Sequence, residues 1–286
     1  MIIDAILSPA ELPALAKRDL RDATCVVFDV LRATSTIVTA LHNGAKAVIP
    51  VAEISEALAI RQKQPGVLLG GERDGVRILA GQTGGIDFDL GNSPREYTPE
   101  MVRGKTIVST TTNGTRALRA CAGAKTVLAA SFLNLTATVQ FIRRLQAAQI
   151  LLVCAGTREN MADEDVLAAG ALCELLDAPL APSLLGAPAS RRPVGSRKPD
   201  FAGETPALPG TVPRFGGVRL NDSAETALGA WRKAKSNLLE AVSAAENARR
   251  LLAIPELRDD VAFCLQQDVF DLVATLGRDG AIRISI

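Results

Sequence analysis

The stretch VVFDVLRATST, residues 26–36, contains signals for both the fold of this chain and its chemistry. Its first residues are apolar and suit a buried strand, which ends on Asp29 and is followed by Arg32. The hydroxyls of Thr34 and Ser35 come next, where a helical pattern begins. Free backbone N–H groups, a helix dipole and an arginine fork together make an anion site. Helix capping and a surface Asp–Arg pair account for the same residues, so both interpretations stand.

Strand-like runs alternate with helical patterns on both sides of this stretch. Continuous apolar runs such as 105–109 and 149–156 suit strands that are buried on both faces. Segments between such runs, including 53–64 and 135–148, place apolar residues at helical spacing. The alternation predicts an α/β fold with a largely parallel or mixed sheet that helices cover on both faces.

An internal similarity links residues 28–50 with residues 107–129, which align with Gly44 on Gly123. Both segments run strand, hydroxyl-rich loop, helix, glycine turn and strand. The pattern predicts two similar βαβ-type halves whose strand-end loops meet at one edge of the sheet. Because the identities are few, chance similarity explains them equally well.

Residues 178–217 interrupt the pattern, since they hold 8 of the 15 prolines and show neither helical nor strand period. We expect a disordered insertion here within a single domain that spans residues 1–286.

The composition excludes several classes of protein. The net charge is +1 without a basic face, so we expect no nucleic-acid partner. No apolar run reaches the length of a membrane span and no secretory leader is visible, so we expect a cytoplasmic protein without a membrane partner. The oligomeric state stays open, and a homo-oligomer fits the sequence. One histidine and five scattered cysteines cannot build a zinc site, which leaves a hard cation on oxygen ligands, Mg²⁺ being the usual partner of phosphate substrates.

Three further loops place similar groups after predicted strands. STTTNGTRAL (109–118) combines hydroxyls, an Asn-Gly turn and an arginine, residues 70–97 carry GGER and GNSP, and residues 154–165 carry an arginine before a helix that begins with acids. Capped helix starts and solvated charged turns are the alternatives for each loop. The candidates from these loops are Glu72, Arg73, Asn92, Ser93, Thr111, Thr112, Asn113, Gly114, Thr115, Arg116, Arg158 and Asp165.

Six motifs carry a resemblance to a known family. DVLRATST (29–36), GGER (70–73), GNSP (91–94), TTTNGTRAL (110–118), CAGT (154–157) and EDVLAAGA (164–171), in this order and spacing, resemble the 2-phosphosulfolactate phosphatase family of magnesium-dependent acid phosphatases. The resemblance implies a three-layer α/β/α fold. It also implies hydrolysis of (2R)-O-phospho-3-sulfolactate to 3-sulfolactate and phosphate, a step of coenzyme M biosynthesis. Residues 178–217 have no counterpart in the family pattern.

The residues agree with an unusual phosphatase, because the familiar phosphoryl-transfer signatures are absent. Such a substrate carries a phosphate, a carboxylate and a sulfonate, so we expect arginines and a dication to bind it. The predicted catalytic residues are Asp29, Arg32, Glu72 and Arg116, and the predicted metal ligands are Asp29, Glu72 and Asp165. The predicted substrate-binding residues are Thr34, Ser35, Arg73, Asn92, Ser93, Thr111, Thr112, Asn113, Gly114, Thr115 and Arg158.

Three questions stay open at this stage. Asp29 either activates a water or attacks phosphorus itself. The substrate is either phosphosulfolactate or another small 2-phospho acid. The third alternative is a non-catalytic binder of phosphorylated metabolites.

Overall fold

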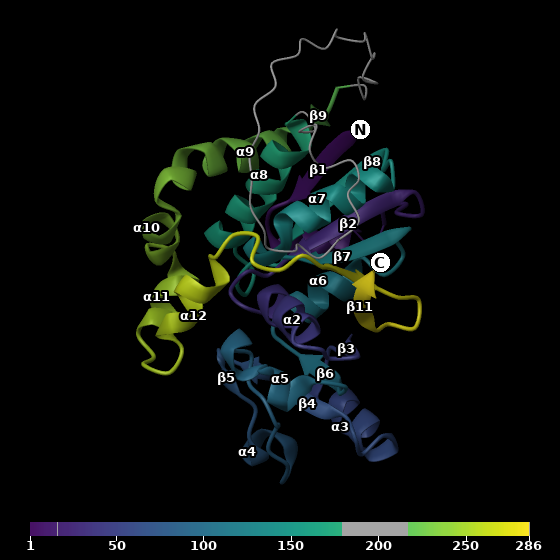
Figure 1. Cartoon of the computed structure of the whole chain (residues 1–286), viewed down its shortest axis with the longest axis vertical. Helices are drawn as coiled ribbons and strands as arrows, with labels where there is room; N and C mark the ends of the chain where they lie inside the picture. The colour runs from purple at the N-terminus through teal and green to yellow at the C-terminus, as the bar shows by residue number, and fades with distance from the viewer. Residues whose placement is uncertain (16, 179–216, 286) are drawn as a thin grey trace, which may run out of the picture.

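A computed structural model describes residues 1–15, 17–178 and 217–285 of the chain (Figure 1). The predicted insertion 178–217 therefore lies outside the described residues, apart from its two end positions.

The described residues form one 11-stranded mixed sheet. Its strands, in order across the sheet, are β5 (Val76–Arg77), β4 (Leu68–Arg73), β6 (Thr106–Thr110), β3 (Ala47–Pro50), β11 (Ile282–Ser285), β10 (Val273–Leu276), β7 (Thr126–Ala130), β2 (Ala23–Phe28), β8 (Gln149–Cys154), β1 (Ile2–Ile6) and β9 (Arg219–Leu220). One parallel block holds β7, β2, β8, β1 and β9, and a second holds β4, β6 and β3. The antiparallel strands β10 and β11 join the blocks, which consequently run in opposite directions.

Helices cover both faces of this sheet. All six residues of β2 are buried, and its side chains alternate between two apolar clusters. Val26 and Phe28 join the cluster under α7 (Leu135–Arg144), α8 (Asp163–Asp177) and α9 (Asp222–Ala234). Cys25 and Val27 join the cluster under α1 (Leu12–Leu15), α2 (Ala33–His42) and α6 (Gly114–Ala120). The three-layer α/β/α prediction is confirmed.

The smaller block carries its own helices. α3 (Ile54–Lys63) packs on β4 and β6 over a cluster that includes Leu69 and Val108. The remaining helices are α4 (Ala80–Thr83), α5 (Pro99–Val102), α10 (Leu238–Ser243), α11 (Glu246–Leu252) and α12 (Arg258–Cys264). Short 3-10 turns are η1 (Pro9–Glu11), η2 (Pro94–Glu96), η3 (Phe132–Asn134) and η5 (Lys235–Asn237).

The two similar segments form strand–helix–strand units that exchange strands. β2 pairs in parallel with β7, and β3 pairs in parallel with β6, so each unit contributes one strand to each block. The halves interlock rather than stand as separate βαβ units. Their helices α2 and α6 contact each other, which brings the loops after β2 and β6 together.

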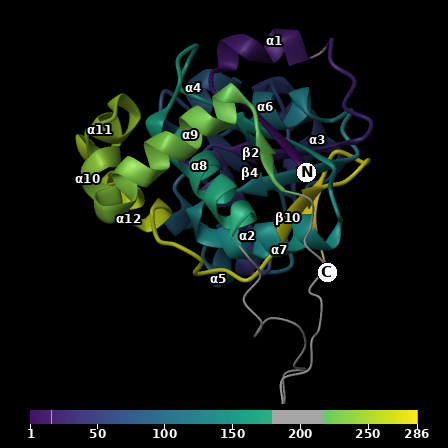
Figure 2. The same ribbon diagram turned by 90° about the horizontal axis from the view of Figure 1, so that it is seen from above.

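The C-terminal helices α10, α11 and α12 gather at one side of the molecule, beyond α8 and α9 (Figure 1 and Figure 2). α12 also contacts the turn η2, which begins at Pro94, the last residue of the GNSP motif. All five cysteines are buried and free. Among the described residues, no helix combines the length and apolar character that a membrane crossing requires.

The close packing of α8 against α9 depends on Gly170. A Cβ at this position would lie 2.1 Å from the carbonyl oxygen of Ala227 and 2.7 Å from Cβ of Trp231. Because one of these atoms is backbone, we expect Gly170→Ala to lower the free energy of unfolding by about 1 to 3 kcal/mol through overpacking. Urea unfolding measures this loss.

Gly229→Ala on α9 is the matched control, because nothing lies within 4 Å of its added Cβ. Helix propensity predicts that this variant is equally or more stable, by up to about 1 kcal/mol. Equal losses in both variants would contradict the packing argument.

Candidate active site

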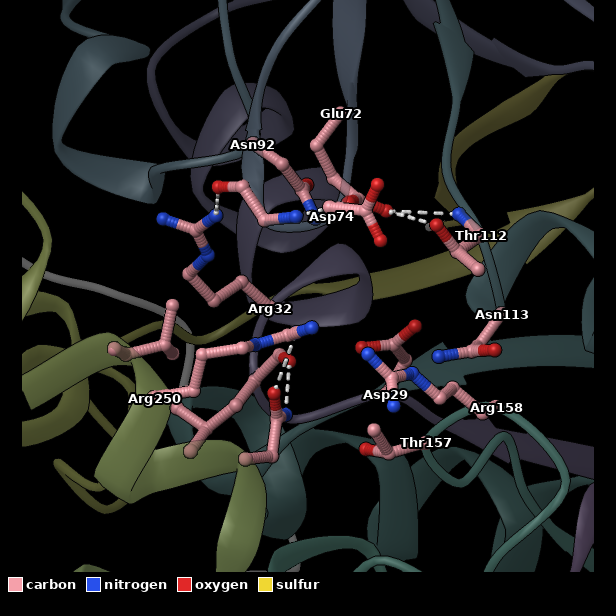
Figure 3. A pocket seen from close by; sticks show the side chains of 14 residues that line it. Asp29, Arg32, Glu72, Asp74, Asn92, Thr112, Asn113, Thr157, Arg158 and Arg250 are labelled. Atoms are coloured by element: carbon pink, nitrogen blue, oxygen red, sulfur yellow. Dashed lines mark hydrogen bonds between the residues drawn. The ribbon is translucent and has the colours of Figure 1, made fainter. Parts of the chain in front are cut away.

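A polar pocket opens where six separate segments of the chain meet. It encloses about 490 Å³ of space, counting the part open to solvent. Of the predicted site residues, its lining includes Asp29, Arg32, Glu72, Asn92, Thr112, Asn113 and Arg158 (Figure 3). Both interlocked halves contribute, since Asp29 follows β2 and Asn113 follows β6.

Asp29 lies at the end of the central strand and is only 8% exposed. Its Oδ1 accepts a hydrogen bond from the N–H of Ala33 at 3.1 Å. Gly114 lies against its other oxygen, so closely that a Cβ on Gly114 would be 2.6 Å from Oδ2. The first residues of α2 and α6 thus hold one carboxylate between them.

The pKa of Asp29 is raised from 3.8 to about 7, mainly by burial and in smaller part by the nearby carboxylates of Glu72 and Glu164. The hydrogen bond from Ala33 opposes this shift by favouring the charged form. The ionised form of Asp29 is therefore disfavoured at this position, and a cation beside the carboxylate would stabilise it.

Glu72 joins two of the loops around the pocket. Its Oε1 accepts hydrogen bonds from the N–H and the hydroxyl of Thr112, at 2.8 and 2.9 Å. Its Oε2 accepts one from the N–H of Gly75 at 2.7 Å. This carboxylate fixes the turn after β4 to the loop after β6.

Arg32 forms a buried ion pair with Asp260 of α12. Arg32 Nη1 lies 2.6 Å from Asp260 Oδ2, and the two side chains are 3% and 0% exposed. Arg32 Nη2 donates to the carbonyl oxygen of Gly75, and Ser93 Oγ donates to Asp260 Oδ1. Asp260 therefore neutralises the charge of Arg32. The sequence analysis instead predicted that Arg32 faces a substrate anion.

Several predicted hydroxyls are used within their own loops. The Thr34 hydroxyl donates to the Asp29 carbonyl and accepts from the Asp29 N–H, and Ser35 donates to the Val30 carbonyl. Thr111 accepts from the N–H of Thr115, whose hydroxyl donates back to the Thr111 carbonyl. These hydroxyls are therefore used in hydrogen bonds within the chain, although neither α2 nor α6 has a side-chain cap at its N-cap residue, and neither they nor Ser93 and Gly114 line the pocket.

Three predicted charged residues also stay outside the pocket lining. Arg73 donates to Thr110 and to the carbonyl oxygens of Glu72 and Ala52. Arg116 is 46% exposed and faces Glu159 at 3.4 Å on the surface. Asp165 is buried, and its two oxygens accept the N–H groups of Val30 and Gly156 at 2.7 and 3.0 Å. Asp165 therefore fixes two loops in place.

The oxygen donors that remain suit a hard dication. Asp29 and Glu72 supply carboxylates, and the buried Oδ1 of Asn113 has no hydrogen-bond partner in the described part of the chain. Magnesium commonly takes one or two carboxylates and keeps several waters, so this set fits it. The predicted trio with Asp165 is not assembled, and the described residues contain no cluster of three His, Cys, Asp or Glu side chains arranged for a metal.

The pocket also contains residues that the sequence analysis missed, namely Asp74, Gly75, Thr157, Asn247 and Arg250. Asp74 and Gly75 form an Asp-Gly turn directly after Glu72, which turn chemistry could have indicated. Asp74 has a φ of 54° and Arg158 a φ of 57°, a left-handed conformation that costs free energy in residues with a Cβ and often occurs at functional sites. Asn247 and Arg250 lie in an ordinary helical pattern that carries no local signal.

A thiol nucleophile does not fit this site. Cys154 is 0% exposed at the end of β8, and burial raises its pKa well above the ordinary value.

The comparison with known proteins agrees with these motifs. A family model described as 2-phosphosulpholactate phosphatase matches residues 10–279. A probable 2-phosphosulfolactate phosphatase of Caldanaerobacter subterraneus is 36% identical over 270 residues, which cover 94% of this chain and 93% of the relative. Relatives with the same name from Thermotoga petrophila and a Synechococcus strain are 36% and 34% identical, over 96% and 97% of this chain and 95% and 94% of their own lengths.

The buried ion pair predicts a large loss of stability on removal of one partner. Asp260→Asn leaves the Arg32 guanidinium buried without a countercharge, so we expect the free energy of unfolding to fall by about 3 to 5 kcal/mol. Asp259→Asn is the matched control, because its carboxylate is 67% exposed and lies 3.4 Å from Arg95. We expect a loss below about 1 kcal/mol for this surface pair. Similar midpoints of urea unfolding for the two variants would contradict a structural role for the pair.

The raised pKa of Asp29 predicts how stability changes with pH in the metal-free protein. Between the unfolded value of 3.8 and the folded value of about 7, the folded state binds more protons at Asp29. Stability contributed by this group therefore falls as pH rises through that window. Urea unfolding in EDTA should show a steeper loss for the wild type than for Asp29→Asn, and parallel pH profiles would refute the shift.

Proposed function

The chain belongs to the 2-phosphosulfolactate phosphatase family, and on that premise we propose that it hydrolyses (2R)-O-phospho-3-sulfolactate to 3-sulfolactate and phosphate. It is a phosphoric monoester hydrolase, and the reaction is of the coenzyme M biosynthesis type. The observation that carries the proposal is the pocket itself, where the carboxylates of Asp29 and Glu72 meet the guanidinium groups of Arg158 and Arg250. A cytoplasmic location and a small anionic substrate are parts of the same proposal.

The charges around the pocket support a dication as cofactor. Asp29, Glu72 and Asp74 are acidic, whereas Arg32 is already paired with Asp260 and only Arg158 and Arg250 are left to balance them. A substrate with a phosphate, a carboxylate and a sulfonate would be repelled by such a pocket. We therefore propose that Asp29, Glu72 and Asn113 Oδ1 hold Mg²⁺. When bound, it neutralises the carboxylates and polarises the phosphoryl oxygens.

The residues of the chain itself bind and orient the phosphoryl group. Arg158, exposed at the rim, can place its fork on the phosphoryl oxygens. Asp29 is fixed by the Ala33 N–H and shielded from bulk water, so it faces the reacting end of the substrate without reorganisation. Attack on phosphorus by Asp29 and attack by a water that Asp29 deprotonates both fit this geometry.

Turnover of phosphosulfolactate with and without EDTA tests the proposal. We expect Mg²⁺-dependent phosphate release by the wild type and a loss of about 100- to 10,000-fold in kcat for Asp29→Asn, with the fold retained in circular dichroism. Asp163→Asn, which changes an exposed acid at the start of α8, should keep wild-type turnover.

Two results would favour the alternatives. Turnover of other 2-phospho acids but not of phosphosulfolactate would indicate a related phosphatase. Thermal stabilisation by the phosphorylated compound without phosphate release would indicate a binder. Full activity of Asp29→Asn would remove Asp29 from the chemical step.

A further inference from the structure

Arg250 enters the pocket from α11, a helix more than 200 residues from the loop that carries Asp29. Its guanidinium lies beside the turn at Gly75, since a Cβ built there would be 3.8 Å from Arg250 Cζ. Figure 3 shows Arg250 and Arg158 extending into the pocket from opposite sides. The two arginines thus belong to different walls of one cavity.

The side chain of Arg250 is held in place by Asn247. Arg250 Nη2 donates to Asn247 Oδ1 at 2.9 Å. Asn247 Nδ2 in turn donates to the Leu31 carbonyl at 2.7 Å and to Glu164 Oε1 at 2.8 Å. Because both acceptors bind the amide nitrogen, the amide oxygen must face Arg250. The guanidinium is therefore positioned before any ligand arrives.

Arg250 also retains unused binding capacity. Its Nε is buried and makes no hydrogen bond within the described part of the chain. The side chain of Arg250 is only half-buried, so its guanidinium can reach an anion in the pocket, and a buried N–H without a partner is costly. Arg32, which lines the same wall, cannot take this role because Asp260 already neutralises it.

We propose that Arg250 binds the sulfonate of the substrate and so determines specificity for it. This inference rests on the proposed function. Phosphate and carboxylate are both attached to C2 of phosphosulfolactate, whereas the sulfonate is attached to C3 and is the charged group farthest from phosphorus. With the phosphoryl group beside Asp29 and Arg158, the sulfonate extends toward the opposite wall, where the Arg250 fork matches its tetrahedral oxygens.

The test compares two substrates that differ only in the sulfonate, phosphosulfolactate and O-phospholactate. We expect Arg250→Met to lower kcat/KM for phosphosulfolactate by about 10- to 100-fold, mainly through KM, because a charge-assisted hydrogen bond is lost. The loss for phospholactate should be at least several-fold smaller. Arg250→Lys, which keeps the charge but lacks the fork, should fall between Met and wild type.

Arg249→Met is the matched control, because Arg249 is exposed on the same helix and lies outside the pocket lining. It should keep the wild-type ratio of the two substrates. Equal losses of Arg250→Met on both substrates would overturn the inference while leaving the proposed function intact.

Binding measurements separate the inference from the proposed function. In calorimetry with Mg²⁺ present, the wild type should bind 3-sulfolactate more tightly than lactate, and Arg250→Met should lose this preference. A wild type that hydrolyses no phosphosulfolactate but shows the preference contradicts the proposed function alone. A preference for 3-sulfolactate that survives in a folded Arg250→Met variant, or its absence in the wild type, rejects the role of Arg250.

Discussion

The buried ion pair between Arg32 and Asp260 is the constraint on which the pocket depends. A guanidinium and a carboxylate this far from water persist only when each satisfies the other, and here Gly75 and Ser93 complete their hydrogen bonds. The pair connects the first strand-end loop, the turn after β4, the GNSP segment and α12. Asn247 of α11 adds a second attachment to the same loop through the Leu31 carbonyl, and it holds Arg250 in place beside Gly75.

The electrostatics of the pocket follow from where its acids lie. Asp29 and Glu72 are oriented by backbone N–H groups, yet burial leaves Asp29 with a pKa of about 7. Two acids in one pocket favour a dication, and the arginines on the two walls favour anions beside it. A small acid with a phosphate and further negative groups suits such a pocket, because its charges can face both the dication and the arginines. The interlocked halves explain why the pocket lies at this place, since the first residues of α2 and α6 lie next to Asp29.

Much of the fold and part of the site could be predicted from the sequence. Apolar runs that end on polar residues marked the strand ends, and Asp29, Glu72, Asn92, Thr112, Asn113 and Arg158 do meet in one pocket. The hydroxyls were harder to assign, because Thr34, Ser35, Thr111 and Thr115 bond within their own loops. A serine or threonine before a helix serves a cap or a ligand with the same local pattern, and only the direction of the side chain decides between them.

The sequence by itself determined the alternation of strands and helices, the family motifs and the loops from which acidic and basic groups emerge, because each is written in residues that are close along the chain. Only the tertiary structure decided that Arg32 is neutralised by Asp260, that Arg73, Arg116 and Asp165 stay outside the pocket lining, and that Asn247 and Arg250 enter it. Two of these outcomes join positions more than 200 residues apart, Arg32 with Asp260 and Asn247 with Leu31. Periodicity and spacing carry information about residues that are close along the chain. The ion-pair partner of an arginine is decided by the distant segment that packs against it.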